Sequence, residues 1–266
     1  MYARMKSTNH WFLTTLINCK QISLNEPSQQ TRTFVTWKKL SKTYRKFWSR
    51  SAKEPPYEHV CQLGDPILRY KTEPVLTGEI KSEKIQKVIS RLTEVSKKYK
   101  SVGLSAPQIG IPLKIFVMEM PNNYLKLFPE EIQIIRQMIP FPRKVFINPQ
   151  MKIINPAKVS FSEACESLRG YSALVPRYHE IEISGKFGFL KRKNFQFIVS
   201  FFLGLNEKGE THAWRIQGWP ARIAQHEFDH LEGKMYIDKM DMNTYQYDFW
   251  YTVNTTNGKH IQRFNK

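Results

Sequence analysis

The 266-residue chain has only three cysteines, Cys19, Cys61 and Cys165, which are too few for a disulfide framework. Their odd number favours a reducing compartment, where a single thiol is available for chemistry. No apolar run approaches the roughly eighteen residues that span a bilayer, so no stable membrane insertion is expected. A composition of 41% hydrophobic and 13% aromatic residues excludes disorder of the whole chain.

Acidic residues are almost missing from residues 1–53. This segment holds eleven Lys and Arg residues against one acid, Glu26, and so carries +10 of the formal net charge of +18. Between positions 34 and 47, large apolar residues recur at steps of three and four with basic residues between them. A helix with this pattern has an apolar stripe and a cationic face, as a mitochondrial presequence does. We therefore predict that residues 1–53 are a presequence, disordered or amphipathic, for the mitochondrial matrix.

Residues 1–53 have two alternative interpretations besides a mitochondrial presequence. A secretory signal would use the short apolar stretch Trp11–Ile17, but this stretch contains two threonines and lacks a clear small-residue cleavage site. The other alternative is a basic tail without a targeting function. In each case the folded domain is expected over residues 54–266, beginning just before Pro55-Pro56.

The rest of the chain shows several strand patterns between two helical ones. Apolar residues at helical spacing predict helices over residues 83–99 and about 220–231. Small residues predict a loop over 102–110. Strands are expected at 60–63, 113–119, 145–148, 151–154, 174–184 and 211–217. This order predicts an α+β fold rather than alternating βαβ units.

The second predicted helix carries a pattern typical of a metal site. His226 and His230 are four residues apart on one helix face, so both imidazoles can reach the same ion, and Glu227 can point at a metal-bound water. A chance pair of histidines is the alternative. Zinc peptidases complete such a site with a later His or Glu, but Tyr236 occupies the His position and no Glu follows Glu232. A third ligand must therefore come from an earlier part of the chain.

Cys165 is the leading candidate for that third ligand, because its thiolate would bind a metal strongly. A buried, inert thiol is the alternative for this cysteine. His179 and His212 compete with it, and the spacing alone leaves the choice open.

Three segments, in this order along the chain, resemble peptide deformylase, and in particular its animal mitochondrial branch. They are Val102–Gly110, Glu163–Ser167 and Gln225–Gly233, supported by Leu63–Arg69 and Phe146–Pro149. The resemblance covers residues from about 60 to 250. It implies an α+β fold with mixed or antiparallel sheets packed around a central metal-binding helix.

The resemblance also implies the site. Cys165, His226 and His230 would hold one divalent metal ion, with Fe²⁺ favoured and Zn²⁺ or Co²⁺ as alternatives. Glu227 would be the general base and acid. The side chain of Gln108 and the backbone N–H of Glu166 would donate to the oxyanion. The expected substrate-binding residues are Val102, Gly103, Glu163, Trp219 and Ile223.

The implied activity is removal of the formyl group from the N-terminal methionine of newly synthesised mitochondrial proteins, with release of formate. The expected partners are nascent N-formyl-methionyl peptides, and transient contact with the mitochondrial ribosome and a homodimer are the further candidates. A metallopeptidase is disfavoured by the missing downstream ligand.

Two departures from the family pattern prompt an alternative, a catalytically weakened deformylase fold that binds the mitochondrial ribosome. Ala164 and Glu166 replace the glycine and leucine of the commonest family motif. Ala164 would be strained if that position needs a positive φ. Glu166 would place a negative charge beside the oxyanion unless its side chain points elsewhere.

Residues 186–204 interrupt the family pattern. These nineteen residues hold four basic residues, no acid and six phenylalanines. Joining Gly185 directly to Leu205 leaves a natural hairpin sequence. An RNA- or membrane-binding loop and a long solvated hairpin are the alternatives, but we favour a translated intron, because Gly-Lys can be encoded by a splice donor and Phe codons by a pyrimidine tract.

Overall fold

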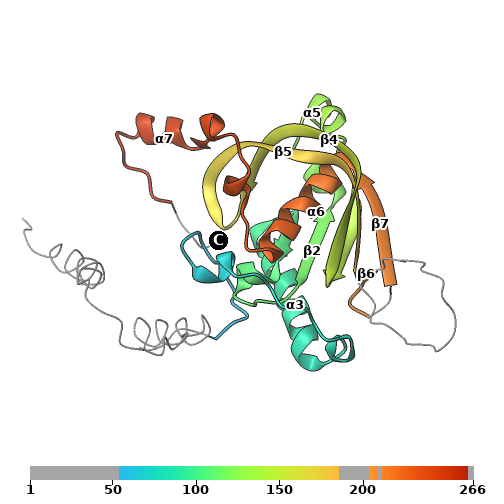
Figure 1. Cartoon of the computed structure of the whole chain (residues 1–266). Coiled ribbons are helices and arrows are strands. Elements are labelled where there is room, and N and C mark those ends of the chain that lie inside the picture. The colour runs from blue at the N-terminus through green and yellow to red at the C-terminus, as the bar shows by residue number, and fades with distance from the viewer. Residues whose placement is uncertain (1–53, 186–203, 209–210, 263–266) are drawn as a thin grey trace, which may run out of the picture. The chain divides into compact units, whose positions relative to one another are not determined.

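The computed structural model describes residues 54–185, 204–208 and 211–262 (Figure 1). The predicted presequence and nearly all of the predicted insertion therefore lie outside the described residues. The predicted α+β class is confirmed by antiparallel pairing of the described strands in the order β1-β2-β3-β6-β7-β5-β4, with β8 added beside β5. The strands are β1 (Gly103–Ser105), β2 (Ile115–Met120), β3 (Phe141–Ile147), β4 (Pro149–Cys165), β5 (Leu168–Gly185), β6 (Gly204–Leu205), β7 (Thr211–Gln217) and β8 (Gln246–Tyr247).

The helices differ greatly in length. The longest are α3 (Glu83–Tyr99) and α6 (Gly218–Leu231), and the short ones are α4 (Asn122–Leu125), α5 (Glu130–Ile135) and α7 (Trp250–Thr255). Among the described residues, no helix combines the length and the apolar character needed to cross a membrane.

Helix α3 occupies the predicted residues 83–99. The Ser82 side chain accepts a hydrogen bond from the backbone N–H of Ile85 at the start, and Lys100 ends the helix in the left-handed region. Its apolar residues recur at helical spacing and are buried in one cluster with residues of β1 and β2. This packing fixes β1, which carries part of the site.

Helix α6 lies inside the curve of the long β4–β5 hairpin, as Figure 1 shows. Small residues such as Ala221 and Ala224 are completely buried, which allows close approach of the surrounding strands. The Gln225 side chain accepts from the Tyr178 N–H at 3.0 Å and donates to the Tyr178 carbonyl at 2.8 Å. These two bonds fix the helix against β5 one residue before His226.

The sequence-based boundaries fail in several places. The loop predicted at 102–110 contains β1, and β3 and β5 begin earlier than the predicted 145 and 174. Two further failures have a clear cause. Residues 60–63 form no strand, because Cys61 N–H donates to the Gln108 carbonyl and Leu63 N–H to the Ser167 carbonyl instead of to a neighbouring strand. Strand β4 is much longer than the predicted 151–154, because its polar, partly exposed residues pair with β5 over nearly their whole length. The strand predicted at 211–217 has the predicted bounds.

Candidate metal centre

Cys165 at the end of β4 and His226 and His230 on α6 converge as a group that could hold a metal, which favours Cys165 over the other candidates as the third ligand. Their ligand atoms all lie within 4.8 Å of one another, and the Cys165 sulfur is 3.3 Å from His230 Nε2. A thiolate and two imidazoles suit a tetrahedral site with its fourth position open. His179 lies on β5 outside this group, and the side chain of His212 lies outside the described part of the chain.

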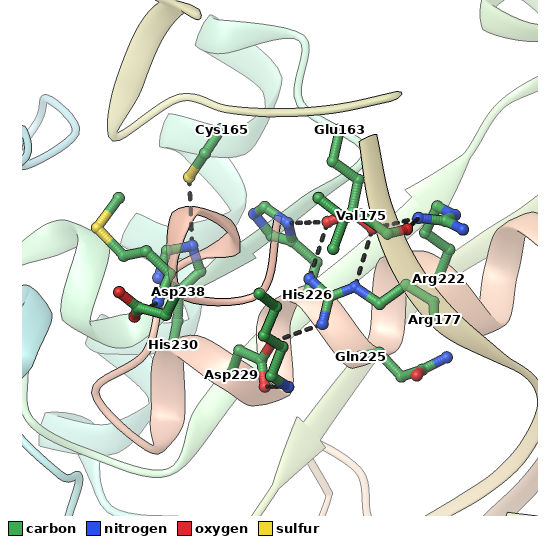
Figure 2. Close-up of polar contacts among 12 residues, drawn as sticks. Glu163, Cys165, Val175, Arg177, Arg222, Gln225, His226, Asp229, His230 and Asp238 are labelled. Carbon is green, nitrogen blue, oxygen red and sulfur yellow. Dashed lines mark hydrogen bonds and ion pairs between the residues drawn. The ribbon is translucent and has the colours of Figure 1, made fainter. Parts of the chain in front are cut away.

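A buried network of charged groups orients the first histidine (Figure 2). His226 Nδ1 is 3.1 Å from a Glu163 carboxylate oxygen, which leaves Nε2 for the metal. Arg177 donates two hydrogen bonds to the same carboxylate at 2.9 and 2.8 Å, and Arg222 donates a third at 2.6 Å. Arg177 also reaches Asp229 on α6 at 2.5 Å. The network therefore links β4, β5 and α6 around the ligands.

The Glu163 carboxylate stays ionised in this network. Burial alone would raise its pKa, but hydrogen bonds from Arg177 and His226 hold that pKa well below its usual range. The Glu163 carboxylate contacts Arg177, Arg222 and His226, so we propose that Glu163 positions His226. Its expected part in substrate binding stays a prediction. Sequence reasoning missed Arg177, Arg222 and Asp229, although charged residues inside largely apolar elements were a usable signal.

Glu227 is buried next to the metal ligands. One of its carboxylate oxygens, Oε2, has no hydrogen-bond partner among the described residues, so it is free to take a proton from a water in the cleft. Burial raises the pKa of Glu227 to about 7, the range that suits proton transfer at neutral pH. A Cβ on Gly103 would lie 2.4 Å from the other oxygen, so glycine is required there for the carboxylate to fit.

The Gln108 side chain points its amide nitrogen into the site. Its Oε1 accepts hydrogen bonds from the backbone N–H and the hydroxyl of Ser105, both at 2.9 Å. This fixes the amide so that Nε2 lies 3.5 Å from the Cys165 sulfur and 3.1 Å from the Ser167 hydroxyl. Gln108 is thus oriented as a donor towards the reacting groups.

The two departures from the family motif are accommodated. Ala164 is not among the residues with a positive φ, so alanine causes no backbone strain there. Glu166 Oε2 lies 3.4 Å from Arg169 Nε, and this ion pair compensates the extra negative charge. The Gln62 side chain donates to the Glu166 carbonyl at 2.8 Å and fixes the backbone beside the thiol.

A cleft of about 600 Å³ opens onto the metal-binding group. The five residues that we expect to bind substrate all line it: Val102, Gly103, Glu163, Trp219 and Ile223. Its wall also includes residues that the sequence reasoning did not select, among them Tyr124, Phe128 and Arg169, and residues of the C-terminal segment. This volume lies in the range of pockets that hold a whole small ligand.

The comparisons with known proteins agree with this geometry. The polypeptide deformylase family model matches residues 57–196 and 202–246. The human protein called mitochondrial peptide deformylase is 39% identical over 201 residues, which are 76% of this chain and 75% of that protein.

Two solved structures share the fold. The peptide deformylase of Thermotoga maritima has a TM-score of 0.52 at 28% identity, covering 70% of this chain and 98% of its own. The Acinetobacter baumannii enzyme, solved with Met-Ala-Ser bound, has a TM-score of 0.54 at 22% identity, covering 68% of this chain and 96% of its own.

Proposed function

The chain belongs to the polypeptide deformylase family and is a metal-dependent hydrolase, and we propose that it deformylates the N-termini of proteins newly made in mitochondria. The observation that carries the activity is the Cys165, His226 and His230 group with Glu227 beside it in an open cleft. The mitochondrial location is supported by the human relative's name and by the basic segment 1–53. Contact with the mitochondrial ribosome and homodimer formation stay predictions.

Each residue of the site has its own role in the proposed reaction. Cys165, His226 and His230 would hold a divalent ion, which would supply Lewis-acid polarisation and would make water a stronger acid. Glu227 takes a proton as water attacks the formyl carbon and returns it to the methionine nitrogen as the carbon–nitrogen bond breaks. Gln108 Nε2 and the backbone N–H of Glu166 stabilise the negative oxygen that forms on the formyl group. The products are formate and a free N-terminal amine.

Val102, Gly103, Trp219 and Ile223 would hold the substrate beside these groups. The aromatic and aliphatic surfaces of Trp219 and Ile223 suit a methionine side chain. The bacterial structure with Met-Ala-Ser bound supports a cleft of this fold as the peptide site. Ferrous iron is our preferred ion because the resemblance to the deformylase family favours it. A thiolate and two imidazoles also suit zinc or cobalt, so the donor set alone does not choose among the three.

Metal analysis of anaerobically purified protein, combined with turnover of formyl-Met-Ala-Ser, tests this proposal. We expect about one equivalent of metal and release of formate. A ferrous enzyme should lose activity in air, whereas zinc has no redox chemistry and would not. Cys165→Ser should lose most of the metal, since a neutral hydroxyl replaces a thiolate.

Cys61→Ser is the matched control, because Cys61 is also a buried cysteine that is in no disulfide but lies outside the metal-binding group. It should keep its metal. Stoichiometric metal in Cys165→Ser would overturn the ligand assignment. A metal-loaded protein without formate release would favour the alternative, a deformylase fold kept for binding the ribosome.

A further inference from the structure

The C-terminal segment after the family match contributes to the substrate cleft. The family model ends at Gln246, whereas the described chain continues to Gln262. Asp248, Phe249 and Gln262 line the same cleft as His226 and Glu227. We call residues 246–262 the C-terminal arm. The arm therefore forms a wall of the cleft from residues that the family pattern does not supply.

The arm is held firmly beside the metal centre. Strand β8 pairs with β5, with Tyr247 opposite Tyr171, and the Asp248 N–H donates to the Gly170 carbonyl at 2.7 Å. A Cβ on Gly170 would lie 2.8 Å from the Tyr247 ring, so glycine is needed for this close approach. Gly170 follows Cys165 by only five residues, which places the arm against the turn that carries the thiol ligand.

Packing of aromatic rings stiffens the arm itself. The His260 ring lies 5.6 Å from that of Phe249 and 6.0 Å from that of Tyr247, and the Tyr247 hydroxyl donates to Gln262 at 3.3 Å. These contacts bring the end of the arm back to its beginning. The side chains that line the cleft are thus set in fixed positions, which selection among peptides requires.

Asp248 carries the charge that the arm adds to the cleft. Its carboxylate accepts a hydrogen bond from the Ser172 hydroxyl at 2.5 Å, and it has no ion-pair partner within the described part of the chain. Four basic residues also line the cleft: Lys100, Arg136, Arg169 and Arg222. Arg169 is paired with Glu166, Arg222 with Glu163, and Arg136 lies over the Trp219 ring. The Asp248 carboxylate is exposed, so it is accessible to a cation that enters with the substrate.

We infer that the arm selects the residues that follow the formyl-methionine, and that Asp248 favours peptides with basic residues there. This inference rests on the proposed function. A cleft of about 600 Å³ has room for more than a methionine side chain, and the arm borders the remaining space. An exposed ion pair contributes little binding energy, so the preference should be modest.

Competing peptides test the inference. The values of kcat/KM are compared for formyl-methionine followed by two lysines, two glutamates, or Ala-Ser. We expect the lysine peptide to exceed the glutamate peptide about threefold to tenfold at low salt, with a smaller ratio at high salt. Asp248→Asn should bring the ratio close to one, and Asp248→Lys should reverse it. Because the readout is a ratio, a general loss of activity cancels.

Asp241→Asn is the matched control. Asp241 is an exposed acid seven residues earlier whose carboxylate accepts from the Asn243 N–H, and it does not line the cleft. This variant removes the same charge and should keep the wild-type ratio. Equal rates on the two charged peptides, or the same ratio in Asp248→Asn as in the wild type, would overturn the inference. No turnover of any peptide, Ala-Ser included, would contradict the proposed function instead.

Discussion

At the scale of single residues, the metal centre depends on a buried network of charges around Glu163. Glu163 lies between two arginines and His226, and each partner comes from a different element or a different turn of α6. Removal of any member leaves a buried charge uncompensated, which is why such a network fixes geometry tightly. The ligand imidazole therefore has a defined orientation before any metal binds.

Arg177→Met should destabilise the fold strongly. The Arg177 side chain is only 2% exposed, and its loss leaves Glu163 and Asp229 buried without their main partner. Breaking a buried pair in this way costs roughly 3 to 5 kcal/mol. The free energy of unfolding in urea measures the loss.

The exposed Arg215 supplies a control for that measurement. It pairs with Glu180 at 2.5 Å, but its side chain is 64% exposed. Arg215→Met should therefore lower the free energy of unfolding far less than Arg177→Met does. Equal losses for the two variants would show that the buried network does not stabilise the fold as argued.

Glu227→Ala should keep the metal and abolish formate release. Glu227 has a carboxylate oxygen without a hydrogen-bond partner in the described part of the chain and is not one of the three ligands. Its loss therefore removes a proton carrier and no metal bond. Metal content and turnover of formyl-Met-Ala-Ser are measured on the same preparation. Lost metal, or turnover near that of the wild type, would show that Glu227 has a different role.

The sequence predicted the ligands better than it predicted their surroundings. His226 and His230 follow from helical spacing alone, whereas Cys165 needed the resemblance to a family, because spacing left His179 and His212 open. Arg177 and Asp229 meet only because β5 crosses α6, and no local pattern encodes that contact. Asp248 was missed because the arm lies beyond the motifs that carry the resemblance.

At the scale of elements, β5 and β6 behave as two halves of one strand. Ser184 of β5 lies opposite Ala213 of β7, so the next two places along β7 are His212 and Thr211. Gly204 and Leu205 of β6 occupy those places. If nineteen residues were removed after Gly185, β5 would continue directly into Leu205, and Leu205 would keep its present partner Thr211 on β7. Nineteen residues is also the length of the predicted insertion 186–204.

The register supports our hypothesis that residues 186–204 are absent from the mature protein. Gly185 pairs with Pro149 of β4, and Gly204 pairs with His212 of β7. In a continuous strand one residue would make both pairings, so these two glycines occupy what would be a single strand position. The break in the family match between residues 196 and 202 also falls inside this stretch. Removal would leave Ser184-Gly-Leu205 as a continuous strand.

Peptide mass spectrometry of the natural protein tests this hypothesis. We expect a peptide that crosses the Gly185–Leu205 junction and none from within 186–204. Recombinant protein without these residues should unfold at a temperature at least as high as the full chain, because the β7 register is preserved. Abundant peptides from inside the segment would contradict the hypothesis and favour a basic, aromatic RNA-binding loop.

Element boundaries were predictable where one periodicity dominated. Helix α3 has a clear apolar stripe and a capping serine, and β7 alternates regularly, so both have the predicted bounds. Helices α4 and α5 were not predicted, because both are short and mix apolar and polar residues. Neither therefore shows a clear helical periodicity of apolar residues. The extended residues 60–63 look like a strand in sequence, but their hydrogen bonds go to loops.

At the scale of the whole molecule, more than half of the net charge lies outside the part of the chain that holds the metal ligands. Residues 1–53 carry +10 of the net charge of +18, whereas the family match begins at residue 57 and contains every metal ligand. The catalytic domain over 54–266 is therefore expected to work without the preceding segment. The human relative's name associates a similar domain with mitochondria.

Removal of residues 1–53 should abolish import into mitochondria without lowering kcat/KM on formyl-Met-Ala-Ser. Import is measured with isolated mitochondria and protease protection, and activity with the purified proteins. A second variant keeps all 53 residues but replaces Lys38, Lys39, Lys42, Arg45 and Lys46 with Gln. Because a presequence needs its cationic face, this variant should also fail to enter, although its length is unchanged. Import of the truncated chain at the full-length level would refute the presequence, and import of the Gln variant alone would show that the basic face between residues 38 and 46 is not the signal.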